Sequence, residues 1–126
     1  MILIFGGVHQ GKLDYALERF GLTRDDVHFC GDEDISMPGG KRLVCGLDKW
    51  ILALVRADKD VSQQVREFAQ SHAQAIVTCD DISCGVVPID PELRKWREAV
   101  GRALGVLASG SDEVIRVFCS IPTRIK

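Results

Sequence analysis

The residues best suited to chemistry in this 126-residue chain form a glycine-rich segment that ends in a lysine. The segment reads Gly6-Gly7-Val8-His9-Gln10-Gly11-Lys12-Leu13 and matches the G-x-x-x-x-G-K pattern of a phosphate-binding loop, or P-loop. In such a loop, backbone N–H groups surround a phosphate at a helix N-terminus, and the lysine neutralises its charge. The pattern normally continues with Ser or Thr, whose hydroxyl binds Mg²⁺, and Leu13 cannot do this. We therefore expect residues 6–13 to bind the phosphates of GTP or ATP; the alternative is a turn whose glycines serve packing alone.

Alternating apolar and amphipathic segments predict the elements that must position this loop. Strands are expected at residues 1–5, 27–30, 42–45, 75–79 and 113–119, with a short sixth at 123–125. Helices are expected at 11–20, 47–57, 63–72 and from Pro91 to about 108, with Gly21 as a stop and Ser62 and Asp90 as N-caps. The segment 31–40, which is acidic and rich in Gly and Pro, is the stretch most expected to be disordered.

Continuous apolar strands separated by helices are typical of a sheet that is covered on both faces. We therefore expect an α/β fold, a P-loop three-layer sandwich with a mostly parallel sheet of about five to six strands and helices on both faces. Residues 1–126 would form a single domain of this kind. Ligands in such folds gather at the carboxyl ends of the strands, where the glycine-rich segment lies.

Composition and charge exclude several classes of function. A net charge of -2 gives no reason to expect a nucleic-acid partner, and no apolar run is long enough for a membrane span. The opening MILIFGG lacks the basic region of a signal peptide, so we expect a cytoplasmic protein with five reduced cysteines. Four of these, Cys30, Cys45, Cys79 and Cys84, fall near predicted strand ends, as does His9. A thiol-based metal or redox protein is thus a third hypothesis, although the spacings match no metal motif and buried structural cysteine is commoner.

Beyond the loop, the chain resembles the bifunctional adenosylcobinamide kinase/adenosylcobinamide-phosphate guanylyltransferase family of cobalamin biosynthesis. Residues 79–88, CDDISCGVVP, are similar to the family's T-N-E-V-G-x-G-I-V-P signature. The opening MILIFGGVHQGKLDYAL resembles M-I-L-V-T-G-G-x-x-S-G-K-S-x-x-A, and residues 96–101, WREAVG, resemble F-R-D-x-x-G. Residues 45–51, CGLDKWI, stand where the family has D-C-L-T-x-W-L. The resemblance implies a P-loop fold, binding of GTP or ATP, and homo-oligomers, which in the family are trimers.

The chain departs from this family at positions that serve catalysis. Family members are longer and carry, between the second and third strands, an H-H-x-x-R-P segment with the histidine that GTP guanylylates; residues 31–42 replace it here. Leu13 replaces the hydroxyl residue of the loop, and Cys45 replaces an acidic residue at a strand end. Asp80 and Asp81 remain, Asp81 in place of the signature's Glu, and are the candidate Mg²⁺ ligands. If the protein is a kinase, Lys12 and Asp81 are the expected catalytic residues, acting in phosphoryl transfer to adenosylcobinamide or a related alcohol.

Two functions follow from this pattern of retention and loss. The first is a nucleotide-binding protein that has lost the guanylyltransferase step. The alternative is a catalytically inert relative with an assembly, regulatory or corrinoid-binding role.

Overall fold

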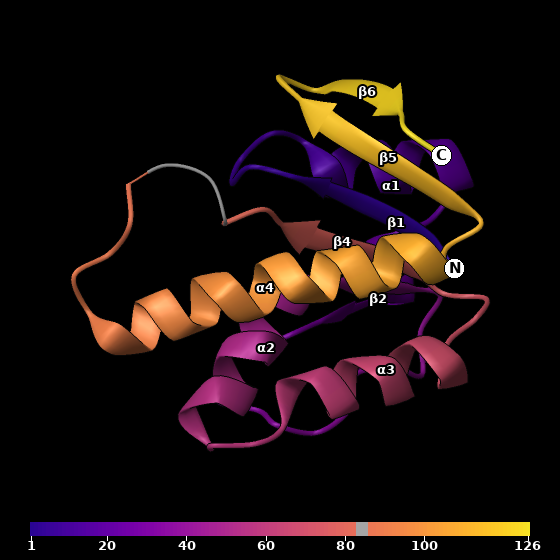
Figure 1. The fold of residues 1–126 in the computed structure, drawn as a ribbon. Coiled ribbons are helices and arrows are strands. Elements are labelled where there is room, and N and C mark those ends of the chain that lie inside the picture. The colour runs from indigo at the N-terminus through magenta and orange to yellow at the C-terminus, as the bar shows by residue number, and fades with distance from the viewer. Residues whose placement is uncertain (83–85) are drawn as a thin grey trace.

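The computed structural model describes residues 1–82 and 86–126, and Figure 1 shows a sheet between layers of helices. Its strands are β1 (Ile2–Gly6), β2 (Val27–Phe29), β3 (Leu43–Cys45), β4 (Ile76–Asp80), β5 (Glu113–Phe118) and β6 (Ile121–Arg124). Its helices are α1 (Lys12–Phe20), the short 3₁₀ helix η1 (Arg24–Asp26), α2 (Leu47–Arg56), α3 (Val61–Ser71) and α4 (Pro91–Gly110). The predicted strands and helices are therefore present in the predicted order.

The sheet has the order β2-β3-β4-β1-β5-β6, and all neighbouring strands are parallel except β5 and β6. β1 thus lies in the middle, between β4 and β5, although β4 follows it by some seventy residues. Because β1, β3 and β4 run in the same direction, their carboxyl ends meet at one edge of the sheet. This arrangement confirms the predicted α/β three-layer sandwich with a mostly parallel sheet.

Two apolar cores lie on opposite faces of the sheet. Successive residues of β1 alternate between them: Leu3 packs under α2, α3 and α4, whereas Ile4 packs under α1. The larger core contains Trp50 and Phe68, both at most 1% exposed, with ring centroids 5.7 Å apart. Burial of both faces explains why the strand sequences are continuously apolar.

Several predicted details were wrong, for local reasons. The N-cap of α3 is Asp60, whose carboxylate accepts from the backbone N–H of Gln63 at 3.1 Å, and not Ser62. The sixth strand begins at Ile121 and forms a hairpin with β5, because residues 119 and 120 make a tight turn. Segment 31–40, expected to be disordered, is anchored to the core where Trp50 Nε1 donates to the carbonyl of Ile35 at 3.2 Å.

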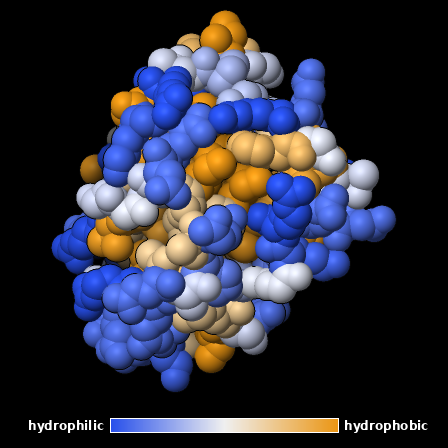
Figure 2. Space-filling model, turned by 90° about the vertical axis from the view of Figure 1, so that its right-hand side faces the viewer, coloured by the Kyte–Doolittle hydropathy of each residue, from blue (hydrophilic) through white to orange (hydrophobic). Residues whose placement is uncertain are grey.

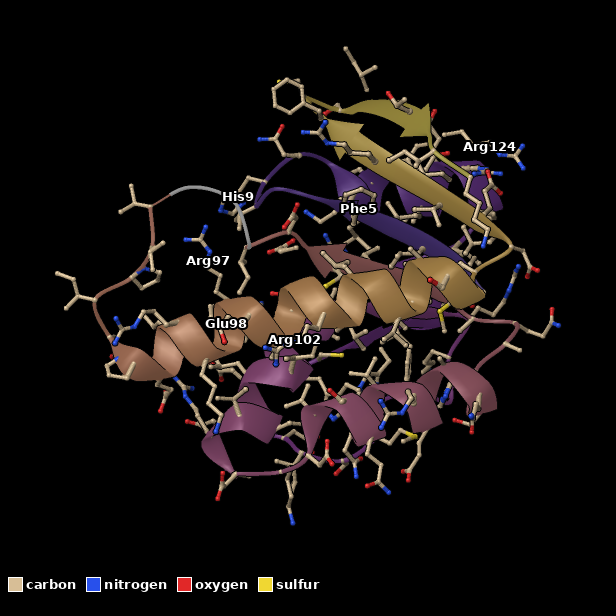
Figure 3. All side chains as sticks on the ribbon, in the orientation of Figure 1. Phe5, His9, Arg97, Glu98, Arg102 and Arg124 are labelled. Carbon is tan, nitrogen blue, oxygen red and sulfur yellow. The ribbon has the colours of Figure 1, made fainter. Side chains whose placement is uncertain are left out.

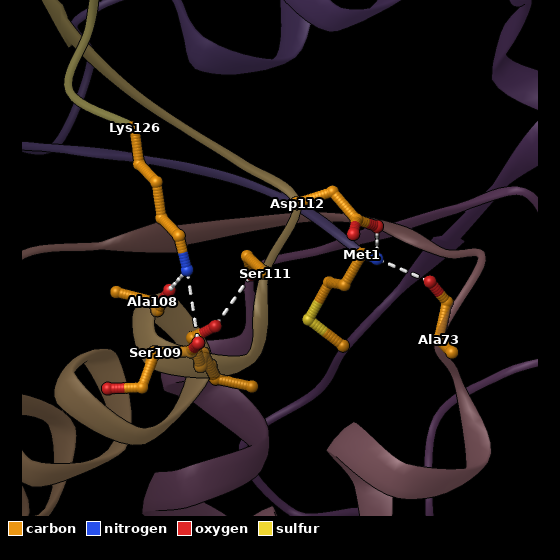
Figure 4. Close-up of polar contacts among 8 residues, drawn as sticks. Met1, Ala73, Ala108, Ser109, Ser111, Asp112 and Lys126 are labelled. Atoms are coloured by element: carbon orange, nitrogen blue, oxygen red, sulfur yellow. Dashed lines mark hydrogen bonds and ion pairs between the residues drawn. The ribbon is translucent and has the colours of Figure 1, made fainter.

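Both chain ends are attached to the body of the protein (Figure 4). The amino group of Met1 donates to the carbonyl of Ala73 and pairs with Asp112 at 3.0 Å. Lys126 Nζ donates to the carbonyls of Ala108 and Ser109 at 3.1 and 3.0 Å, which places a positive charge at the C-terminus of α4. On the side where the two ends lie, hydrophilic side chains surround a central patch of apolar surface (Figure 2). None of the helices in the described ranges combines the length and apolarity that crossing a membrane requires.

Candidate functional site

The glycine-rich segment forms the connection between β1 and α1, at the carboxyl edge of the sheet. Gly6 lies so close to β5 that a Cβ atom built on it would be 2.3 Å from the carbonyl oxygen of Val117. Gly11 is the N-cap of α1 and has a φ of 93°, in a region that L side chains rarely adopt. No side chain caps α1 among the described residues, so the N–H groups of its first turn face the loop without a side-chain acceptor.

The turn between β5 and β6 holds the loop in place. The backbone N–H of Cys119 donates to Oε1 of Gln10 at 2.6 Å, and that of Ser120 donates to the carbonyl of Gln10 at 2.9 Å. Both turn residues have positive φ, 50° and 62°, the geometry of a two-residue type I′ hairpin turn. The hairpin therefore serves as a support for the loop, in addition to closing the edge of the sheet.

Lys12 is the central charged group of the site. Its ammonium donates to the carbonyl of Gly7 at 2.6 Å and forms an ion pair with Oδ1 of Asp80 at 2.7 Å. The side chain of Lys12 is only 8% exposed, and that of Asp80 24%. The lysine therefore curls back over the loop, where its charge is compensated by a carboxylate at the end of β4. The neighbouring Asp81 donates its backbone N–H to the carbonyl of Gly6 at 2.8 Å and links the two strand ends.

A cavity of about 580 Å³ opens at this edge of the sheet. That volume is within the range of small-molecule sites. Figure 3 shows His9 on the loop at this end of the molecule, remote from the two chain ends. The cavity is lined by the loop, the first turn of α1 and the ends of β3 and β4: Val8, His9, Gln10, Gly11, Lys12, Leu13, Asp14, Arg24, Cys45, Gly46, Lys49, Thr78 and Asp80. The structure thus brings six of the eight expected loop residues and Asp80 to one cavity, while Gly6, Gly7 and Asp81 are absent from its lining.

A buried polar network fixes the strand ends below the cavity. Asp48, in the first turn of α2, is 3% exposed and accepts the backbone N–H of Asp80 at 3.0 Å. Burial raises the pKa of Asp48 above its ordinary value, and the charge of Asp80 raises it further. Gly46 donates its N–H to Thr78, and the indole of Trp96 donates to the carbonyl of Asp48 at 2.8 Å. The backbone of Asp80 is therefore held at the end of β4, where its carboxylate pairs with Lys12.

The donor atoms of this cavity suit a nucleotide better than a bare metal ion. No group of three or more His, Cys, Asp or Glu side chains with the geometry of a metal site exists among residues 1–82 and 86–126. The cavity wall offers the carboxylates of Asp14 and Asp80, while Leu13 stands where a hydroxyl ligand was sought. Mg²⁺ binds proteins through one or two carboxylates together with substrate phosphates and water, so these residues fit an ion brought in by a nucleotide.

Cys30, Cys45 and Cys79 have the properties of structural thiols, whereas Cys119 is exposed. Burial raises the pKa of Cys30 to about 12 and also raises the pKa values of Cys45 and Cys79. A thiol of raised pKa carries little thiolate at neutral pH, and thiolate is the form that binds metals and attacks disulfides. Cys84 lies outside the described residues. This chemistry gives the thiol-based hypothesis no support from the three buried or half-buried cysteines.

Sequence reasoning missed four polar residues of the cavity: Asp14, Arg24, Lys49 and Thr78. Lys49 could have been found, since it lies one helical turn after the predicted strand at 42–45. Thr78 could also have been found, since it lies near the end of the predicted strand at 75–79. Arg24 gives no such signal, because its place depends on how η1 directs the chain back to the sheet.

A second, smaller cavity of about 230 Å³ lies between α2, α3 and α4. Apolar side chains such as Val55, Val65 and Val106 line it, together with exposed charges such as Glu98 and Arg102, which Figure 3 shows on α4. Unlike the first cavity, it contains no strand end and no glycine-rich turn.

No protein-family model matches this chain, and no curated protein matches it either.

Proposed function

We propose that this protein binds a nucleoside triphosphate, GTP or ATP, in the cavity at the carboxyl edge of the sheet. The phosphates would lie on the glycine-rich loop, against the N–H groups at the start of α1, with the ammonium of Lys12 as their counter-ion. The observation that carries the proposal is the position of Lys12, whose ammonium lies over the loop, bonded to Gly7 and Asp80. The resemblance to the adenosylcobinamide kinase/guanylyltransferase family supports the same ligand class.

Asp80 gives this proposed site a specific property. Its carboxylate lies 2.7 Å from the ammonium of Lys12, the group proposed to hold the phosphate. A phosphate must therefore share the ammonium with a negative charge, and a divalent ion between the two would relieve the repulsion. We therefore expect Mg²⁺ to strengthen nucleotide binding, with Asp80 as its protein ligand.

A binding protein without turnover is the second candidate, and Leu13 favours it. An apolar side chain lines the cavity at the position where the loop pattern calls for a metal-binding hydroxyl. Phosphoryl transfer depends on metal ions that bridge and neutralise the phosphates. A site that binds Mg²⁺ weakly, because it lacks this hydroxyl, would therefore still bind the nucleotide but turn it over slowly.

Isothermal titration calorimetry with GTP and ATP, with and without Mg²⁺, tests the proposal. Lys12→Gln removes the charge and leaves a shorter polar side chain, and we expect it to weaken binding at least tenfold. Arg66→Gln removes an equal charge from α3, outside the cavity, and should leave binding unchanged. No binding to the wild type at millimolar nucleotide, or equal binding by Lys12→Gln, would refute the proposal. Turnover of nucleotide with adenosylcobinamide separates a kinase from a binding protein.

A further inference from the structure

Gln10 joins the glycine-rich loop to the turn of the β5–β6 hairpin with both its side chain and its backbone. Its Oε1 accepts the backbone N–H of Cys119 at 2.6 Å, and its carbonyl accepts the backbone N–H of Ser120 at 2.9 Å. The same residue lines the cavity in which we place the nucleotide. Gln10 is therefore the residue at which an effect on the hairpin would reach the loop.

Two glycines of the loop bring its backbone into close contact with the hairpin. A Cβ on Gly6 would lie 2.3 Å from the carbonyl oxygen of Val117, in β5, and a Cβ on Gly11 would lie 2.8 Å from Oγ of Ser120. At such close approach, the loop cannot change its conformation without a movement of the hairpin. The conformations of the two segments are therefore linked.

The turn of the hairpin depends on these contacts for its position. β6 lies at the edge of the sheet, where it pairs with β5, and all four of its residues are exposed (Figure 1). Lys126 anchors the far end of this segment to the carbonyls at the end of α4. At the near end, Cys119 and Ser120 have φ values of 50° and 62°, which are unfavourable for residues other than glycine. The bonds to Gln10 therefore help to hold the turn in this conformation.

We propose that Gln10 is a positioning residue, through which the β5–β6 hairpin fixes the conformation of the loop and thereby its affinity for phosphate. The inference rests on the proposed function for the identity of the ligand, whereas the link between loop and hairpin does not. A loop that is already held in place loses less conformational freedom when it binds phosphate, so an ordered hairpin raises the affinity. Because such coupling is reciprocal, bound phosphate also stabilises the turn.

Two variants break the link from opposite sides. Gln10→Met has a side chain of similar length but removes the acceptor of the Cys119 N–H. Thr123→Pro acts on the hairpin: since the nitrogen of Pro122 faces the free edge of the sheet, the N–H of Thr123 faces β5, and a second proline removes it. Gln63→Met is the matched control, because Gln63 is exposed on α3, outside the cavity.

Calorimetric titration with GTP measures the coupling. We expect Gln10→Met and Thr123→Pro each to weaken binding roughly three- to tenfold, the range of one neutral hydrogen bond, and Gln63→Met to leave it unchanged. The double variant should bind GTP within twofold of the weaker single variant, because both substitutions remove the same link. Wild-type affinity in either single variant, or a double variant whose loss is the product of the two single losses, would overturn the inference.

Backbone ¹⁵N order parameters of the nucleotide-free proteins separate this inference from the proposed function. Thr123→Pro should lower the order parameters of residues 8–11, and Gln10→Met should lower those of Cys119 and Ser120. If these changes occur but GTP does not bind to the wild type, the link between loop and hairpin is supported while the nucleotide proposal fails. If GTP binds and the order parameters of both segments keep their wild-type values in the variants, the role of Gln10 is refuted.

Discussion

Replacing Asp80 by Asn should strengthen nucleotide binding in the absence of metal. Two oxygens held by one ammonium lie about 4–4.5 Å apart, so a phosphate on Lys12 would be that close to the Asp80 carboxylate. Unit charges at this distance repel by about 4 kcal/mol at an effective dielectric of 20 and by about 1 kcal/mol in water. Because the Asp80 side chain is 24% exposed, we expect the repulsion to lie between these limits, at about 1–3 kcal/mol. Removing it corresponds to a gain in GTP affinity of roughly 5- to 150-fold.

The same substitution should remove the benefit of Mg²⁺. In the wild type we expect Mg²⁺ to raise the affinity for GTP, since the ion would lie between two negative groups. In Asp80→Asn the repulsion and the metal ligand are both gone, so titrations in EDTA and in Mg²⁺ should give similar affinities. Glu67→Gln is the matched comparison, because it removes one negative charge from α3, outside the cavity.

Calorimetric titrations of the three proteins, in EDTA and in Mg²⁺, make this measurement. Thermal melts provide the folding control, because loss of a partly buried ion pair should destabilise Asp80→Asn by about 1–3 kcal/mol. If the affinity of Asp80→Asn for GTP in EDTA stays within twofold of the wild-type value, or is lower, the predicted repulsion by Asp80 is refuted.

Three further predictions concern the scaffold. Gly6→Ala should destabilise the protein by more than about 2 kcal/mol, because its Cβ would be 2.3 Å from a carbonyl oxygen of β5. Gly7→Ala should be tolerated, because its Cβ would be 3.5 Å from the nearest side-chain atom. Urea denaturation of the two variants compares their free energies of unfolding. Ser120→Gly should stabilise the β5–β6 turn by about 0.5–1 kcal/mol, since Ser120 has a φ of 62°, and an unchanged or lower melting temperature would contradict this. The pKa of Glu113 is lowered by Arg19 at 2.8 Å, so Glu113→Gln should cost about 0.5–1 kcal/mol at pH 7 after allowing for solvent screening. This difference should vanish as the pH falls from the ordinary value of 4.5 through the lowered pKa, and a cost that is as large in acid, where Glu113 is protonated, as at pH 7 would argue against it.

Local signals predicted the elements well where a single residue determines the geometry. Asp90 accepts the N–H groups of Glu92 and Leu93 at the start of α4, as an Asp before Pro predicts. Gly21 ends α1 with a φ of 63°, as a glycine after an amphipathic segment predicts. The N-cap of α3 was ambiguous because Asp60 and Ser62 are both good caps, and the sequence alone does not rank them.

The candidate site depended on features that local patterns do not contain. The pairing of Lys12 with Asp80 follows from β1 lying beside β4, a contact between residues far apart in the chain. The contribution of the β5–β6 turn to the loop was missed, since Cys119-Ser120 lacks the Asn-Gly signature of a type I′ turn. The sequence thus indicated the glycine-rich loop and one carboxylate of the cavity, and long-range topology supplied the remaining walls.

Amide chemical shifts measured during titration with GTP test the proposed binding of nucleotide phosphates to the glycine-rich loop. We predict the largest shifts at the amides of residues 7–13 in the wild type, and their loss at the same GTP concentration in Lys12→Gln. Shifts confined to the cavity between α2, α3 and α4, or an unperturbed loop at millimolar GTP, would contradict nucleotide binding by this loop.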